Sequence, residues 1–285
     1  MELLGAKLQF EAAMNYYKGV PASGYERDHV RALMLVTNLE TLTAAEEQSV
    51  IASVKRRQQI EEAANAGLVE AMYKAGKMYY SGDGTKLNKK VALDWFLKAA
   101  NKNHMRAQKM CADMYFMGDG IDSNETKALF WYEKAASQDD VESMAKCGSL
   151  YHKKCDYENA IEWYKKAIVI GDSDSLKGIG DVYSELAILD EHEMKLIDSN
   201  QDFSDLAEHW YKQAITLYEE EAMFGSWRAM VCLGEMYLEG KGTEVDVQKA
   251  KEYFSKVAYQ KNARPNGDCS IYWQNQAIKK LEAIE

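Results

Sequence analysis

Residues 75–84 read AGKMYYSGDG, and residues 111–120, 36 positions later, read CADMYFMGDG. Three further copies follow, as CGSLY at 147–151, GDVY at 180–183 and LGEMYLEGKG at 233–242. A fixed period of this length is typical of repeat proteins, in which each unit buries its apolar face against its neighbours. The period therefore predicts a stack of similar units.

A second motif follows each copy of the first. It reads ALDWFLKAA at 92–100, ALFWYEKAA at 128–136, AIEWYKKA at 160–167, AEHWYKQA at 207–214 and AKEYFSKVA at 250–258. The alanines three before and four after the first aromatic residue share one helical face, so this motif predicts a second helix. Each unit is thus expected to be a pair of helices.

A small residue stands three positions before the tyrosine of the first motif, at 76, 112, 148, 180 and 234. It lies one turn away on the same face, where a small side chain lets the paired helix approach closely. The tyrosine and the aromatic pair of the second helix supply the bulk that fills the seam. The Gly-x-Gly segments supply the positive φ with which the first helix ends.

Two units deviate from the pattern. In the third, Tyr151 and Trp163 are only 12 residues apart instead of 16, which predicts a shorter turn. In the fourth, an acidic insertion at 187–204 either lengthens the two helices or forms a loop. The predicted divisions are degenerate N-terminal capping helices at 1–62, repeats at 63–104, 105–140, 141–172, 173–224 and 225–262, and a C-terminal capping helix at 263–285.

The ends carry helical patterns of their own. An apolar stripe of Phe10, Ala13, Met14 and Tyr17 predicts a first helix, with a partner over Val30–Leu42. A longer helix is expected over Ala44–Ala66 and a capping helix over Ile271–Ile284.

The pattern Leu/Met-Gly-x-x-Tyr-x-x-Gly-x-Gly, followed by Ala-x-x-Trp-Tyr-x-Lys-Ala-Ala, resembles the Sel-one-like repeat family, a relative of the tetratricopeptide repeat. The resemblance implies an all-α, right-handed superhelical solenoid of antiparallel helix pairs, whose first helices line a concave face. It also implies protein–protein interaction, because family members serve as adaptors, scaffolds, bacterial virulence factors and immunity proteins that neutralise a toxin. Some secreted members carry a cysteine pair in each repeat. Here the second helices end in Ala-Ala instead, which argues against an extracellular location.

Transferring the tetratricopeptide geometry position by position gives candidate residues for a partner-binding concave face. They are Tyr73, Lys77, Tyr80, Arg106, Lys109, Asp113, Phe116, Ser149, His152, Lys177, Asp181, Glu185, Arg228, Glu235 and Leu238. Tyrosine, phenylalanine and arginine are common anchors of protein interfaces. The early residues would make one end of the face basic and the later ones would make the other end acidic, so that a partner with opposed charges would be oriented.

Composition excludes several classes of protein. A net charge of −10 over 285 residues disfavours a nucleic-acid binder and attraction to anionic lipid. Five cysteines are too few, and odd in number, for a disulfide framework. The first residues lack a basic start followed by an apolar run, and no apolar stretch approaches the length of a membrane span, so we expect neither a signal peptide nor such a span. These features favour a reducing cytoplasm.

No catalytic or metal-binding pattern stands out. No histidine has a second histidine four positions later, and the Gly-Asp-Gly turns lack the residues that complete a phosphate or calcium loop. Cys111 and Cys147 occupy equivalent positions and are expected to be buried thiols. No nucleophile, base and orienting group converge, so we expect no enzyme, metal or cofactor.

The favoured hypothesis is a non-catalytic bacterial adaptor, an immunity or inhibitor protein, or a virulence-associated protein, with a toxin or effector among the candidate partners. Two alternatives stay open. One is an enzyme that acts on cell-wall peptide material. The other is a self-assembling scaffold, which would show a large apolar patch at Val30–Val36 or Ile271–Ile284.

Overall fold

The computed structural model describes residues 44–83, 85–189, 202–259 and 268–284, and every regular element in these ranges is an α-helix. The chain divides into two compact units, Met1–Trp131 (unit 1) and Tyr132–Glu285 (unit 2). Each unit is considered by itself.

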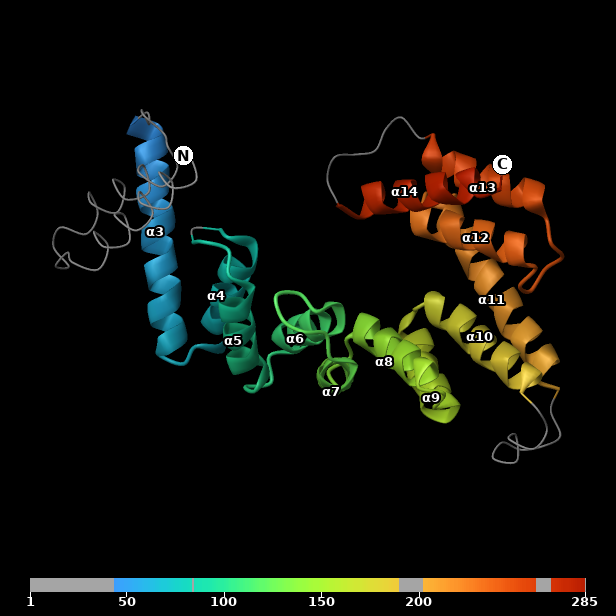
Figure 1. Ribbon diagram of the computed structural model, residues 1–285, viewed down its shortest axis with the longest axis horizontal. Helices are drawn as coiled ribbons and strands as arrows, with labels where there is room; N and C mark the ends of the chain where they lie inside the picture. Colours follow the sequence, from blue (N-terminus) through green and yellow to red (C-terminus); the bar gives the residue numbers. More distant parts are fainter. Residues whose placement is uncertain (1–43, 84, 190–201, 260–267, 285) are drawn as a thin grey trace, which may run out of the picture. The chain divides into compact units, whose positions relative to one another are not determined.

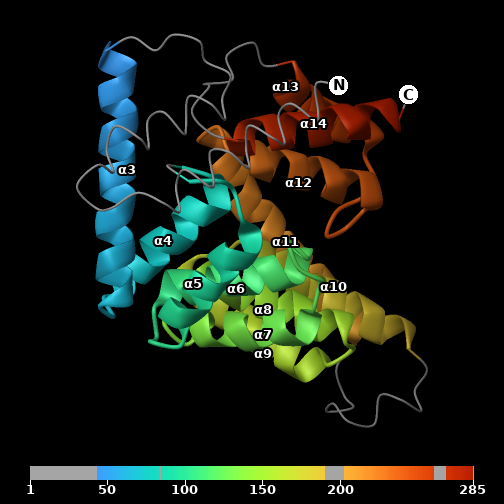
Figure 2. The ribbon, with the colours of Figure 1, turned by 60° about the vertical axis from the view of Figure 1, so that its left-hand side comes forward.

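In unit 1, consecutive helices pack side by side, α3 on α4, α4 on α5 and α5 on α6 (Figures 1 and 2). Their bounds are Ala44–Asn65 for α3, Val69–Ser81 for α4, Lys89–Ala100 for α5 and Met105–Met117 for α6; α7, Glu125–Ala136, crosses into unit 2.

Unit 2 continues the alternation, and its last three helices, α12, α13 and α14, pack on one another (Figure 1). Its helices after α7 are α8 (Val141–Lys153), α9 (Tyr157–Ile170), α10 (Asp174–Ile188), α11 (Phe203–Met223), α12 (Trp227–Glu239), α13 (Val247–Ala258) and α14 (Asp268–Glu282). The predicted all-α stack of helix pairs is confirmed.

The helices predicted near Ala44–Ala66 and Ile271–Ile284 are present as α3 and α14. The stripe around Phe10 and its partner Val30–Leu42 lie outside the described residues, as do residues 190–201 of the insertion. The division of the chain into repeats stays a prediction.

Four of the first helices carry a glycine where the second helix approaches, whereas α6 has Ala112 at this position. A Cβ atom on Gly76, Gly148, Gly180 or Gly234 of a first helix would lie 2.5–2.6 Å from the ring of the aromatic residue opposite it on the second helix. The rings are those of Phe96, Tyr164, Tyr211 and Phe254, respectively. The predicted close approach is therefore confirmed, because the ring occupies the space in which any side chain would stand.

Tyr164 also connects one pair to the next. A Cβ on Gly178 of α10 would lie 2.6 Å from the same ring, so the Tyr164 ring lies between glycines of two successive first helices. Its hydroxyl forms a hydrogen bond with Ser149. One aromatic side chain thus fixes both contacts.

The glycine turns have the predicted conformation. Gly82, Gly118 and Gly240 end α4, α6 and α12 with φ between 70° and 77°. In the third pair, Cys155 replaces the glycine at a φ of 59°, and only three residues separate α8 from α9. The shorter turn expected from the spacing of Tyr151 and Trp163 is therefore present.

The repeat tyrosine of the first helix is tied to the preceding second helix. Tyr79 donates to Glu61 (2.6 Å), Tyr151 donates to Glu133, and Tyr237 donates to Glu219 (3.1 Å). In each case the two residues are 18 positions apart, half of the repeat period. These hydrogen bonds join successive pairs at their half-buried edge.

Helix α11 is longer than its counterparts. Its motif ends at Ala214, but the helix continues to Met223 because Tyr218 is fully buried and donates to Asp174 (2.6 Å) at the start of α10. The fourth pair therefore departs from the repeat at the end of its second helix as well as at the acidic insertion.

Gly234→Ala is expected to lower the free energy of unfolding by about 1–3 kcal/mol, because the new methyl group overlaps the Phe254 ring. Helix propensity alone predicts the opposite, a gain of about 0.5–1 kcal/mol. Urea unfolding followed by circular dichroism measures the change, with Gln248→Ala at an exposed position of α13 as control. A stabilised Gly234→Ala variant would refute the glycine–aromatic contact.

The fold is also expected to lose stability in alkali. A hydrogen bond to Asp119 raises the pKa of Tyr80 to about 12, and burial raises that of Tyr164 to about 12. An unfolded tyrosine titrates near pH 10, so the unfolded state releases its protons first. The stabilisation that these two tyrosines give is complete below about pH 10, and it is lost as the pH rises through their pKa in the folded protein.

Urea unfolding between pH 8 and 12, combined with phenolate absorbance, measures this loss. The free energy of unfolding should stay constant at first and then fall as the pH rises. The phenolate absorbance should rise together with unfolding. Ionisation of all 18 tyrosines near pH 10 in a chain that stays helical would contradict the expectation.

Candidate functional site

The residues predicted to line a binding face all lie on the first helix of a pair, on α4 and α6 in unit 1 and on α8, α10 and α12 in unit 2. Within each unit the surroundings of these side chains decide which of them are available to a partner.

In unit 1, Tyr73 is held in place by His104. The Nδ1 atom of His104 accepts a hydrogen bond from the Ala107 N–H (3.1 Å), so the proton of the neutral ring is on Nε2, which lies 3.0 Å from Glu70. The ring stacks on Tyr73 with centroids 4.7 Å apart. The same hydrogen bond lowers the pKa of Glu70. Both nitrogens of the imidazole are therefore used, Nδ1 within the first turn of α6 and Nε2 to hold α4 against α6.

Two of the candidate cations lie on the same two helices as Tyr73 and His104. Lys77 follows Tyr73 by one turn on α4, and Arg106 lies in the first turn of α6; both are exposed. Burial raises the pKa of Tyr73, while the positive charges of Arg106 and Lys109 oppose this rise, so these cations are close to the ring. In the part of the chain that the structure describes, neither Lys77 nor Arg106 forms an ion pair.

The other candidates of unit 1 differ in availability. Tyr80 is engaged at the turn after α6, where Asp119 accepts hydrogen bonds from Tyr80 and Lys89. Burial alone would raise the pKa of Asp119, but these two donors hold it below its usual value. Asp113 is half-buried, whereas Phe116 is 38% exposed near the end of α6.

In unit 2, the charged candidates pair with one another. His152 on α8 lies 3.0 Å from Glu185 on α10, and Lys177 on α10 lies 3.7 Å from Glu235 on α12. Glu235 also forms an ion pair with Lys280 of α14, at 2.9 Å. Lys177, Glu235 and Lys280 therefore form ion pairs within the protein, and the His152–Glu185 contact links α8 to α10.

Asp181 and Leu238 are similarly occupied. Asp181 accepts hydrogen bonds from the Tyr211 hydroxyl and the Lys241 ammonium, both at 2.8 Å. Leu238 packs against the buried cluster of α11–α14. Ser149 is exposed and bonded to Tyr164.

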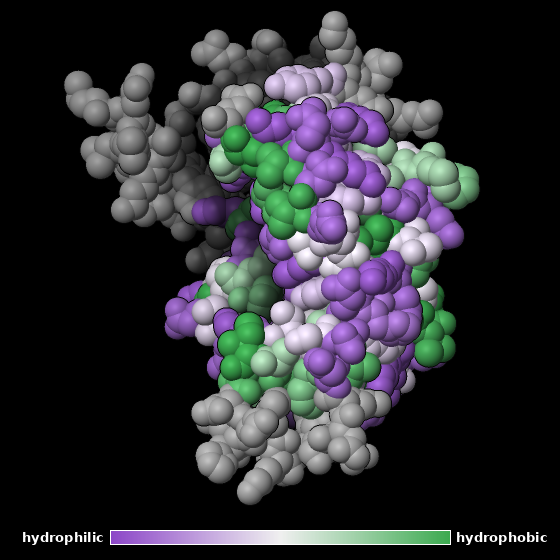
Figure 3. All heavy atoms as spheres, turned by 90° about the vertical axis from the view of Figure 1, so that its right-hand side faces the viewer, coloured by the Kyte–Doolittle hydropathy of each residue, from purple (hydrophilic) through white to green (hydrophobic). Residues whose placement is uncertain are grey.

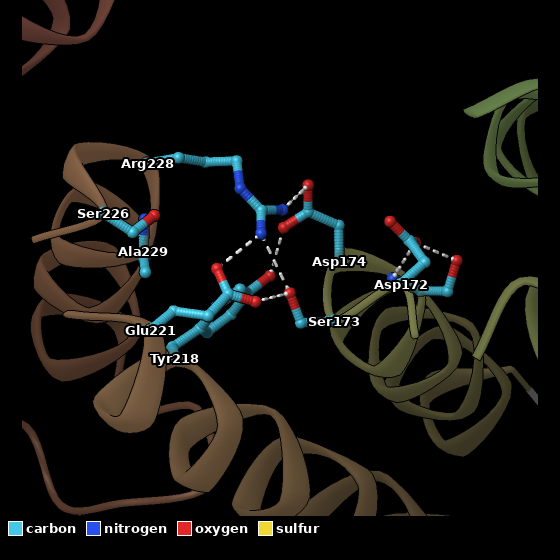
Figure 4. A network of polar contacts seen from close by, with 9 residues as sticks. Asp172, Ser173, Asp174, Tyr218, Glu221, Ser226, Arg228 and Ala229 are labelled. Carbon is cyan, nitrogen blue, oxygen red and sulfur yellow. Dashed lines mark hydrogen bonds and ion pairs between the residues drawn. The ribbon is translucent and has the colours of Figure 1, made fainter. Parts of the chain in front are cut away.

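Arg228 is the centre of a polar network that joins three helices (Figure 4). Its guanidinium contacts Asp174 (2.5 Å) from α10 and Glu221 (2.6 Å) from α11, and it donates to the Ser173 hydroxyl (3.0 Å). Ser173 in turn donates to Glu221 (2.6 Å). Burial by itself would lower the pKa of Arg228, but the carboxylates of Asp174 and Glu221 hold this pKa above its ordinary value. The network anchors the extended end of α11.

The balance of basic and acidic residues differs along the chain, whereas the charge gradient expected along the concave face stays a prediction. Residues 44–131 contain 13 Lys and Arg and 11 Asp and Glu, whereas residues 132–285 contain 18 and 29. The surplus of cations is therefore in unit 1, where Lys77 and Arg106 are unpaired among the described residues.

Several residues of these networks were not predicted, namely His104, Glu221, Lys241 and Lys280. One signal was present for Lys241. The central residue of a Gly-x-Gly turn reaches an earlier first helix, since Asp119 bonds Tyr80 and Lys241 bonds Asp181. A lysine in place of aspartate at the centre of the turn therefore indicates that the residue it contacts on the earlier first helix is acidic.

Signs of catalysis or metal binding were sought in the same ranges. Among the described residues, no group of three or more His, Cys, Asp or Glu side chains is arranged to hold a metal ion. Burial raises the pKa of the Cys111 and Cys147 thiols, and both side chains are fully buried, as predicted. None of the described helices is both long enough and apolar enough to span a membrane.

Apolar side chains reach the surface in several places. Figure 3 shows them as separate green areas among polar side chains on one face. On α14, Ile271 (58% exposed), Tyr272 and Ile278 are exposed, in the segment where a self-assembling scaffold would show its patch; Val30–Val36 lies outside the described residues. All three side chains lie on this one capping helix.

Arg228→Met is expected to lower the free energy of unfolding by about 1–3 kcal/mol, because it leaves Asp174 and Glu221 without their cation. The guanidinium is 30% exposed, so the loss is smaller than for a fully buried pair.

Lys212→Met is the matched control, since Lys212 and Glu208 form an exposed pair one turn apart on α11. Its expected cost is at most about 0.5 kcal/mol. Equal urea midpoints for the two variants would show that the network does not anchor α11.

Comparisons with known proteins agree with the repeat. The Sel1 repeat model matches residues 6–36, 69–104, 106–140, 143–168, 199–218 and 227–262, more than half of the chain. In a comparison with curated protein sequences, none matches this chain.

Among solved structures, a Sel1 repeat protein from Oxalobacter formigenes superimposes with a TM-score of 0.51 and 22% identity, covering 81% of this chain and 95% of that one. The protective antigen c5321 of uropathogenic Escherichia coli gives a TM-score of 0.48 at 17% identity, covering 98% and 74%. The immunity protein Pa5087 from Pseudomonas aeruginosa gives 0.41 at 17%, covering 76% and 82%. We base the fold comparison on the Oxalobacter protein. With six matched segments and glycine-closed helix pairs, the chain belongs to the Sel1 repeat family.

Proposed function

We propose that this protein is a non-catalytic binding module that holds a partner polypeptide against the first helices of unit 1, α4 and α6. Sel1 repeats are in general protein-interaction modules, and the proposal concerns where on this chain the interaction takes place. The observation that carries it is the contrast in charge pairing between the two units.

Exposed charges that already have partners gain little from a ligand, because binding must first break the existing contact. In unit 2 the candidate ions Lys177, Asp181 and Glu235 have such contacts. In unit 1, Lys77 and Arg106 have none among the described residues, and the exposed edge of Phe116 lies on the same helix as Arg106. Arginine and aromatic side chains are the types that anchor protein interfaces most often.

Within this class, we propose a bacterial role as an adaptor, as an immunity or inhibitor protein that binds a toxin or effector, or as a virulence-associated protein. Buried free thiols at Cys111, Cys147 and Cys232 are compatible with a reducing compartment, and we propose the cytoplasm.

A photocrosslinking amino acid at position 116 tests the proposal, with position 130 as the matched control. Both positions hold an exposed phenylalanine in unit 1, Phe116 on the first helix α6 and Phe130 on the second helix α7. In cells of the source organism, position 116 should crosslink to one or a few defined proteins and position 130 should not.

Mass spectrometry of the crosslinked species then identifies the partner. Adducts that are the same from both positions, or adducts from position 130 alone, would contradict binding at the first helices.

A further inference from the structure

We propose that the segment bound by unit 1 is an acidic peptide, whose carboxylates pair with Lys77 and Arg106 and whose apolar side chains contact Tyr73 and Phe116. The cation–aromatic face is defined by these four residues of α4 and α6. This inference rests on the proposed function and specifies the chemistry of the partner.

The first argument is the charge of the cation–aromatic face. Lys77 and Arg106 are exposed and lack a carboxylate at ion-pair distance in the described ranges. The nearby carboxylate of Glu70 is held by His104 at 3.0 Å, and the charge of Arg106 helps to lower its pKa without reaching ion-pair distance. The positive charge of Arg106 acts on the Tyr73 ring, and Lys77 follows Tyr73 by one turn of α4, so a ligand carboxylate at either cation gains a charged contact.

The second argument is the contrast with unit 2. There, the candidate ions of the first helices already have counter-charges, in the pairs Lys177–Glu235 and Lys241–Asp181. Residues 132–285 also hold 29 acidic against 18 basic residues, which repel an acidic segment. Among the described residues, unit 1 is the part suited to an acidic ligand.

The third argument is the rigidity of the aromatic component. Tyr73 is stacked on His104, whose ring is fixed by hydrogen bonds at both nitrogens. A pre-oriented ring loses little entropy when an apolar side chain packs on it. Phe116 adds a second, partly exposed ring. The ligand is therefore expected to combine carboxylates with at least one apolar residue.

A nucleic acid shares the negative charge but fits less well. Its affinity comes from neutralising many phosphates, and each basic contact adds only a small increment. Two unpaired cations in a chain of net charge −10 provide few such contacts. The chemistry of the cation–aromatic face favours a short segment with carboxylates and apolar groups.

Selection from a library of random peptides displayed on phage tests the proposal with the full chain as bait. The variant Lys77→Glu/Arg106→Glu reverses the charge of the face. The matched control Lys90→Glu/Lys102→Glu makes the same change of net charge at exposed lysines on α5 and in the turn after it. Circular dichroism confirms that both variants are folded.

The expected result is enrichment of peptides rich in Asp and Glu with an apolar residue. The leading synthetic peptide should bind the Lys77→Glu/Arg106→Glu variant at least about tenfold more weakly than the control variant, and wild-type binding should weaken as salt is raised.

The other outcomes overturn the proposal in distinguishable ways. Enriched peptides without an acidic excess, or peptides that bind both variants equally, refute the acidic ligand and leave the proposed function standing. No enrichment on the wild-type chain refutes both. Equal competition by a single-stranded oligonucleotide would show that the face recognises charge alone. Salt-sensitive self-association that only Lys77→Glu/Arg106→Glu abolishes would assign the face to a second copy of this chain.

Discussion

The structure depends on the contact between a helical glycine and an aromatic ring. At Gly76, Gly148, Gly180 and Gly234 the ring of the second helix fills the space of the missing side chain. This contact brings the two helices of a pair close together and sets their register, because the ring can face the glycine at only one position. Tyr164, which lies against Gly148 and Gly178, extends the same contact to the next pair. The repetition of one interaction therefore builds the stack.

Polar groups at the edges of these contacts complete the stack. The hydroxyl of the repeat tyrosine reaches a glutamate 18 positions earlier, on the preceding second helix, and the central residue of the glycine turn reaches an earlier first helix. Because Tyr79 and Tyr151 are half-buried and Tyr237 is buried, their hydroxyls need partners within the protein. Packing and hydrogen bonding thus use the two ends of the same tyrosine.

The same surface of the first helices serves different purposes in the two units. In unit 2 its charges join successive helices, and Arg228 with Asp174 and Glu221 anchors the longer α11. In unit 1 the cations Lys77 and Arg106 are left without such partners in the described part of the chain. A surface that is not needed to hold the stack together is available for a ligand, which is why we assign binding to α4 and α6.

The sequence by itself determined the helix pairs, their glycine contacts, the short third turn and the buried cysteines, because these depend on local spacing and residue size. It also listed the first-helix residues from which a binding face can be chosen. Only the tertiary structure decided which of them are already paired, since partners such as Lys241 and Asp181 are 60 positions apart. The extension of α11 was likewise decided by tertiary contacts: Tyr218 continues the helix because it is buried and bonded to Asp174. Ion pairs between distant helices follow no sequence period, so, apart from the lysine in the last glycine turn, the pattern that predicted the fold gave no indication of them.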